Sequence, residues 1–171
     1  MGYTHNFAFR DKKNGERTKK INKSKFAVVS CIVKDFAEKV KEMGIEIAGP
    51  SGDGEPIFNN KVIAFNGAGK NAHESFYIDA DGSFMDDYHF SNPFCKTERK
   101  PYDLLVCLTL LAFKHVFKNE FFYDSDGTTR ENINDPESIK YWESINWTPR
   151  IEPEWQKAYD MWDNSPWGKA E

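Results

Sequence analysis

The stretch that decides the fold is an apolar run of ten residues, Leu104-Leu105-Val106-Cys107-Leu108-Thr109-Leu110-Leu111-Ala112-Phe113. A helix that is apolar on all sides is normally buried at the centre of a domain. The run is too short to span a bilayer, which takes roughly 20 residues. It therefore predicts a central core helix over about residues 101–117, with Pro101 at the favoured first position, and no membrane association.

Three cationic residues, Lys96, Arg99 and Lys100, come just before this helix. The first N–H groups of a helix have no partner inside it, and its dipole is positive at that end. Together these features predict a receptor for a phosphate or carboxylate. Asp103 would either complement the dipole or orient Arg99 or Lys100 within the site. The alternative is a solvated basic turn with Glu98 as the local partner.

Working outward, the hydrophobic spacing predicts alternating short strands and amphipathic helices. The expected strands are 3–9, 57–58, 61–66, 74–78 and 121–125, and the expected further helices are 25–43, 136–145 and 153–163. Residues 83–94 are irregular and aromatic. This order has too few crossovers for a doubly wound sheet. We predict a single α+β domain over 1–171, with a mostly antiparallel sheet packed on the central helix and a C-terminal helical extension at about 136–171.

Composition limits the partners. The chain has 171 residues, 39% hydrophobic and 15% aromatic, as expected of a folded globular protein. A net charge of −4 without a long basic tract argues against duplex nucleic acid. The three cysteines are widely spaced and match no structural zinc pattern, which predicts reduced thiols and neither metal nor cofactor. Without the apolar core of a signal peptide at its N-terminus, the protein is expected in the cytoplasm.

Three histidine positions are candidates for chemistry. His5 lies on the aromatic side of the first predicted strand, where it is either a hydrogen-bonded core or edge residue or a catalyst. The pair His73-Glu74 could carry out acid–base work, or simply begin a strand with polar residues. His115 ends the central helix, roughly 20 Å from Lys100 at a rise of 1.5 Å per residue, so one small ligand would not reach both.

The aromatic residues Trp155, Tyr159 and Trp162 recur at helical spacing near the C-terminus. This spacing is typical of ordinary core packing. If the three side chains were exposed together, they would form a face for a homo-oligomer or a platform for base stacking.

Several motifs resemble an uncharacterised family of small phage and bacterial proteins. They are the opening Met-Gly-Tyr-Thr-His, the Asn66-Gly67 and His73-Glu74 region, the run Phe94-Cys95-Lys96-Thr97-x-Arg99-Lys100-Pro101-Tyr102-Asp103, and Ser125-Asp126-Gly127. The resemblance covers roughly residues 1–127. It implies no activity and no catalytic residues, but it suggests a phage setting, with host interaction or counter-defence in the host cytoplasm.

The sequence therefore predicts a protein that binds an anionic small molecule, a nucleotide or a nucleotide-derived signal. The candidate ligand-binding residues are Lys96, Arg99, Lys100, Asp103, His5, His73 and Glu74. Two alternatives remain open: a metal-independent hydrolase or phosphodiesterase that uses His5, His73 or Glu74 as acid or base, and an inhibitor that binds a host protein through an aromatic surface.

Overall fold

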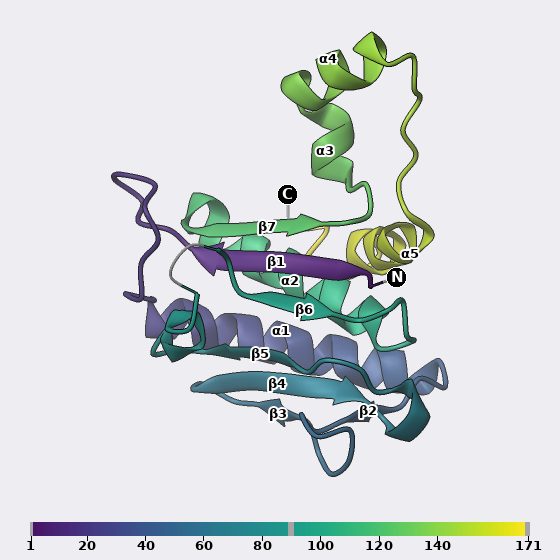
Figure 1. Ribbon diagram of the computed structural model, residues 1–171. Coiled ribbons are helices and arrows are strands. Elements are labelled where there is room, and N and C mark those ends of the chain that lie inside the picture. The colour runs from purple at the N-terminus through teal and green to yellow at the C-terminus, as the bar shows by residue number, and fades with distance from the viewer. Residues whose placement is uncertain (1, 89–90, 170–171) are drawn as a thin grey trace.

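The strands form two antiparallel sheets that lie edge to edge in front of the two long helices, α1 and α2 (Figure 1). The computed structural model describes residues 2–88 and 91–169. Helices pack on antiparallel sheets around an apolar, aromatic core. This arrangement confirms the α+β fold predicted from the sequence.

The first sheet has three strands in the order β6-β1-β7. The central strand β1 (Thr4–Phe9) pairs with β6 (Phe94–Lys96) on one edge and with β7 (Phe121–Ser125) on the other. Successive side chains point to opposite faces of a strand. The register of β1 places His5 opposite Ser125, two positions along from the pair Phe7 and Tyr123.

The second sheet is built around β4 (Val62–Gly67). It pairs with β5 (Phe76–Asp79), with β3 (Ile57–Phe58) and, near its end, with β2 (Ile47–Ala48). The two sheets are joined where the Glu74 N–H, just before β5, donates to the Lys96 carbonyl of β6 at 3.2 Å. The strands on either side of this junction therefore form one nearly continuous layer (Figure 1).

Helix α2 (Asp103–Phe117) is the centre of the core, and eleven of its fifteen residues are buried. It packs against α1 (Lys23–Glu42) on one side and α5 (Pro153–Asp163) on another. Burial on several sides explains why its sequence is apolar all round. Helix α1 is amphipathic instead, and its N-cap is Asn22, whose side chain accepts the Lys25 N–H at 2.9 Å.

Between β7 and α5 the chain forms two helices that extend away from the sheets (Figure 1). These are α3 (Arg130–Asn134) and α4 (Pro136–Ser144), and neither contains a buried residue. We call residues 130–149 the arm. The aromatic residues of α5 lie in the core instead: Trp155 and Tyr159 are buried and Trp162 stacks on Phe36. This confirms core packing for that aromatic spacing.

The predicted elements are present, with shifted ends. The main difference is the start of α2, which begins at Asp103 and not at Pro101. Residues 97–100 form a turn closed by the Lys100 N–H and the Thr97 carbonyl at 3.0 Å, so Pro101 belongs to the connection. Strands β2 and β6, helix α3 and three short 3-10 helices, Gly69–Asn71, Ser83–Met85 and Lys118–Glu120, were not predicted, and β6 begins at the end of a region predicted to be irregular.

Candidate functional site: a buried chain of hydrogen bonds around His5

A continuous chain of short polar contacts passes through the imidazole of His5, which is fully buried. Its Nδ1 lies 2.5 Å from the Ser125 hydroxyl, and its Nε2 lies 2.6 Å from Oδ1 of Asp103. With Asp103 ionised, Nε2 carries the ring proton, and this N–H donates a hydrogen bond to the carboxylate. Nδ1 of the neutral ring then accepts the O–H of Ser125. Two sequence-predicted residues, His5 and Asp103, are thus in direct contact.

Asp103 is 1% exposed and receives two further donors. The Thr97 hydroxyl donates to its Oδ1 at 2.6 Å, and the Cys107 thiol, one helical turn along α2, donates to Oδ2 at 3.6 Å. Burial, and then the negative charge of Asp103, raise the pKa of the Cys107 thiol well above its usual range. The thiol therefore keeps its proton and remains a donor. This carboxylate is compensated by hydrogen bonds from three side chains.

Tyr3 and Trp155 flank the His5 ring, each in an edge-on contact, with ring centroids 5.1 and 5.8 Å away. Both side chains are buried. Among the described residues, neither the Tyr3 hydroxyl nor the Trp155 indole N–H has a hydrogen-bond partner. Burial raises the pKa of Tyr3, so its hydroxyl stays protonated. Buried donors without a partner are uncommon in folded proteins and are a feature of ligand and catalytic sites.

Arg99 covers the outer side of Tyr3, with its guanidinium 4.4 Å from the ring centroid. The same group lies 3.4 Å from Glu152 and 3.9 Å from Glu154, at the start of α5. Glu98 and Arg99 both have left-handed backbone angles, with φ of 51° and 56°. Such angles are costly for residues with a Cβ, and they persist where surrounding contacts fix the turn. Here the hydrogen bond from the Thr97 hydroxyl to Asp103 ties the start of this turn to the start of α2.

The three predicted cations have different neighbours. Arg99 meets the two glutamates, Lys96 Nζ lies over the Phe94 ring at 5.4 Å, and Lys100 Nζ donates to the Lys70 carbonyl at 3.2 Å. The first N–H groups of α2 also have partners, since those of residues 103–105 bond to the carbonyls of residues 100–102. The structure therefore does not provide the free N–H groups that the sequence-based anion site assumed.

His73 and Glu74, predicted as an acid–base pair, both bond to the backbone of Lys96. His73 Nδ1 lies 2.7 Å from the Lys96 carbonyl oxygen, and Glu74 Oε2 accepts the Lys96 N–H at 2.8 Å. His73 Nε2 lies 3.3 Å from Glu98, so the imidazole bridges a carbonyl and a carboxylate. No hydrogen bond between the two predicted partners is found within the described parts of the chain. Their contacts fasten β6 to the second sheet.

His5, Asp103 and Cys107 could also be considered as a metal site, because their ligand atoms lie within 4.8 Å of one another. Ligands of one tetrahedral zinc ion, each at about 2.0–2.3 Å from the metal, lie roughly 3.3 Å or more apart. His5 Nε2 and Asp103 Oδ1 are 2.6 Å apart, which is a hydrogen-bond distance. The cluster as it stands fits proton sharing and does not fit a metal centre.

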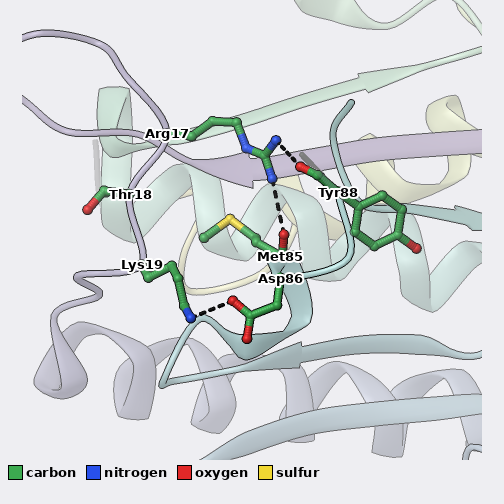
Figure 2. Close-up of a pocket in the computed structure, with 6 residues that line it drawn as sticks. All are labelled: Arg17, Thr18, Lys19, Met85, Asp86 and Tyr88. Carbon is green, nitrogen blue, oxygen red and sulfur yellow. Dashed lines mark hydrogen bonds and ion pairs between the residues drawn. The ribbon is translucent and has the colours of Figure 1, made fainter. Parts of the chain in front are cut away.

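A separate pocket of about 320 Å³ lies between the loop after β1 and the loop after β5 (Figure 2). Its charged groups are engaged with each other and with the backbone. Arg17 donates to the carbonyls of Met85 and Tyr88, and Lys19 forms an ion pair with Asp86. These contacts hold the two loops together, so we assign the residues of this pocket a structural role.

Sequence reasoning did not identify Ser125, Thr97, Cys107, Tyr3 and Trp155 as members of the site. Ser125 gave a usable signal, because it shares strand parity with the buried Phe121 and Tyr123 and is polar. The segments that carry the family resemblance meet here: the Thr4 N–H donates to Asp126 at 2.9 Å, and the Thr97 N–H donates to the Tyr3 carbonyl at 2.8 Å.

In the parts of the chain that the structure describes, no helix combines the length and apolar character needed to cross a membrane. No protein-family model matches the chain, and neither a curated protein nor a solved structure matches it.

Proposed function

We propose that the protein is a metal-independent ester hydrolase in which Ser125 is the nucleophile, His5 the general base and Asp103 the residue that orients His5. The observation that carries this proposal is the unbroken chain from the Ser125 hydroxyl through both nitrogens of His5 to Asp103, with links of 2.5 and 2.6 Å. A hydroxyl, an imidazole and a buried carboxylate in this order form the functional unit of serine hydrolases, which recurs on unrelated folds.

The chemistry follows from the direction of the proton transfers. Ser125 Oγ attacks the electrophilic carbon or phosphorus of the ester while its proton passes to His5 Nδ1. The protonated imidazole is stabilised by Asp103, and it then gives the proton to the departing alkoxide. A water molecule, deprotonated by His5, cleaves the seryl ester and restores Ser125. Ser125 is half-buried at the end of β7, whereas His5 is fully buried, so a substrate would reach the pair from the side of Ser125.

Negative charge that develops on the substrate needs donors that are not already used. The Tyr3 hydroxyl and the Trp155 indole N–H are the two donors beside His5 that lack partners among the described residues. Fixed donors of this kind stabilise an oxyanion without reorganisation. Gly127 supports the placement of Tyr3, because a Cβ at this position would lie 2.2 Å from the Tyr3 hydroxyl oxygen.

The test is covalent labelling with a fluorophosphonate probe, followed by peptide mass spectrometry. We expect the wild-type protein to be labelled at Ser125 and Ser125→Ala to lose the label. Asp103→Asn should slow labelling about 10²- to 10⁴-fold, because the imidazole loses its orienting acceptor. The exposed Ser51→Ala is the matched control and should react like wild type. A folded wild-type protein, checked by its melting curve, that carries no label at Ser125 would refute the proposal.

A second function, nucleotide binding, is favoured by one contact. Because Lys100 Nζ donates to the Lys70 carbonyl, the loop Gly67-Ala68-Gly69-Lys70 lies beside the start of α2. Lys70 and Lys96 are exposed, so their ammonium groups are available to the phosphates of a nucleotide or nucleotide-derived signal. Such binding, together with the free thiol of the exposed Cys31, fits a cytoplasmic protein and the phage setting suggested by the resemblance.

Calorimetric titration with a panel of nucleotides and cyclic nucleotides tests this second function. Loss of one charge-assisted bond costs about 1.5–3 kcal/mol, so Lys96→Ala should weaken binding about ten- to a hundredfold. Lys12→Ala, in the exposed loop after β1, should bind like wild type. Heat of binding that is equal in the two variants, or absent for every nucleotide of the panel, would rule out the site.

A further inference from the structure

The largest concentration of exposed apolar side chains lies on the arm, far from His5. Nine large apolar residues of the described chain are exposed, and four of them fall within nine positions. These are Ile139, Tyr141, Ile145 and Trp147, with side chains 38–62% exposed. Trp142 belongs to the same group, because its ring packs edge-on against Trp147 at 5.8 Å. We call Ile139, Trp142, Ile145 and Trp147 the arm patch; Tyr141, two positions from Ile139, points to another side of α4.

Nothing in the fold of the described chain requires the arm patch. Helix α4 has no buried residue, and its position away from the sheets leaves its surface uncovered (Figure 1). The arm is attached at its base, where Arg130 bonds to Asp163 with both terminal nitrogens, at 3.2 and 2.9 Å. Contiguous exposed apolar surface of this kind marks an interaction site, and tryptophan and tyrosine contribute most of the binding energy in such sites.

A cleft at the base of the arm extends this surface. Its volume is about 560 Å³. Its lining combines aromatic residues of the core, including Tyr123, Tyr159 and Trp162, with the charged residues Arg130, Glu131 and Asp135 of the arm. Ile139 and Trp142 are three residues apart and share one side of α4, and Asp135, the N-cap of this helix, lines the cleft at its start.

The cleft also contains a polar atom without a hydrogen bond. Tyr123 lines the cleft, is 93% buried, and its hydroxyl forms no hydrogen bond in the described chain. The neighbouring Tyr159 hydroxyl accepts the Arg130 N–H at 2.7 Å, and its second lone pair faces Tyr123 only in poor hydrogen-bond geometry. A group inserted into the cleft would offer the Tyr123 hydroxyl a better partner.

The charge of the arm indicates the chemistry of the partner. Residues 131–150 contain four acidic and two basic side chains, namely Glu131, Asp135, Glu137 and Glu143 against Lys140 and Arg150. Arg130 is neutralised by Asp163. Glu131 and Asp135 line the cleft, and Glu137 and Glu143 belong to α4, so a partner that buries this surface is favoured if it places cations beside an apolar face.

We propose that the arm patch and the adjoining cleft bind an amphipathic segment of a partner protein, with an apolar face flanked by lysine or arginine. A large apolar side chain of that segment occupies the cleft, and its apolar face covers Ile139, Trp142 and Trp147. Its cations lie against Glu131, Asp135 and Glu137. A second copy of this chain is a poorer match, because its basic segment at residues 10–20 contains no apolar side chain.

Fluorescence anisotropy with two labelled 14-residue helical peptides tests the proposal, one of leucine and lysine and the other of leucine and glutamate. We expect saturable micromolar binding of the lysine peptide and at least tenfold weaker binding of the glutamate peptide. The double variant Ile145→Ser/Trp147→Ser, and separately Glu137→Lys, should each weaken lysine-peptide binding about tenfold or more. The matched controls Val28→Ser and Glu38→Lys, both exposed on α1, should bind like wild type.

Several outcomes would overturn the proposal. Equal binding of the two peptides, or equal weakening by the α1 controls, would show nonspecific adsorption. A concentration-dependent dimer in sedimentation that is lost in the double variant would identify a second copy as the occupant. A melting temperature lowered by many degrees in the double variant would show that the patch supports the fold. None of these outcomes depends on Ser125, so the hydrolase proposal is tested separately.

Discussion

At the scale of single residues, Asp103 has the most demanding position in the molecule. Its carboxylate is almost completely removed from water and accepts from His5, Thr97 and Cys107. A buried carboxylate is tolerated only when hydrogen bonds replace its contacts with water. The three buried donors in turn need the carboxylate as their acceptor.

Asp103→Ala should therefore lower the free energy of unfolding by about 3–5 kcal/mol, because it leaves buried donors without acceptors. Urea denaturation followed by circular dichroism measures the effect. Asp124→Ala, exposed on β7, is the control and should change the free energy of unfolding by no more than about 0.5 kcal/mol. Equal values for the two variants would mean that the hydrogen bonds accepted by Asp103 do not stabilise the fold.

Strand parity was enough to predict that His5 faces inward among aromatic side chains, because alternation is a local property. Its partner could not be predicted this way. His5 and Asp103 are 98 positions apart, and only the packing of β1 on the start of α2 brings them together. The shared anion site of the three cations stays a prediction; in the structure Arg99 contacts Glu152, Lys96 lies over Phe94 and Lys100 bonds to the Lys70 carbonyl.

At the scale of elements, prediction was most successful where one face of the chain is buried over several turns. The periodicity of α1 and the apolar run of α2 are strong signals, because a buried position in a helix requires an apolar side chain. Strand β6 has three residues and α3 has five, so their positions depend on neighbours supplied by distant parts of the chain. Short elements leave little periodicity in a sequence.

Leu108→Asp tests whether α2 is the core. Leu108 is fully buried, midway along the helix, and an unpaired charge there costs several kcal/mol against a total stability of roughly 5–15 kcal/mol. We expect no cooperative melting transition in calorimetry. The control Lys34→Asp, on the exposed side of α1, should melt close to wild type. Cooperative melting of soluble Leu108→Asp would exclude α2 as the folding core.

At the scale of the whole molecule, the two sheets depend on a small junction. Glu74 connects them twice, because its carboxylate accepts the Lys96 N–H and its N–H donates to the Lys96 carbonyl; its own carbonyl accepts the hydroxyl of Tyr102, just before α2, at 2.6 Å. The Cys95 thiol also donates to that carbonyl, at 3.4 Å, from inside the core. Burial raises the pKa of Cys95, so it is protonated and unreactive in the closed junction.

Glu74→Ala removes the carboxylate contact, worth about 1 kcal/mol, and should speed the reaction of Cys95 with a thiol-specific disulfide reagent about fivefold. The exposed Cys31 is an internal reference and should react at an unchanged rate. Peptide mapping distinguishes the two thiols. An unchanged Cys95 rate would mean that the backbone contacts alone keep the junction closed.

The two ends of the arm meet. The Glu152 N–H donates to the Thr128 carbonyl at 3.1 Å, so the chain leaves the body after β7 and returns to it at almost the same point before α5. In topological terms the arm is an insertion whose two ends lie next to each other. The entropy of closing a loop changes only slowly with its length. This part of the sequence can therefore lengthen, shorten or be replaced in evolution, and so acquire new partners, without altering the strands and helices that hold His5 in place.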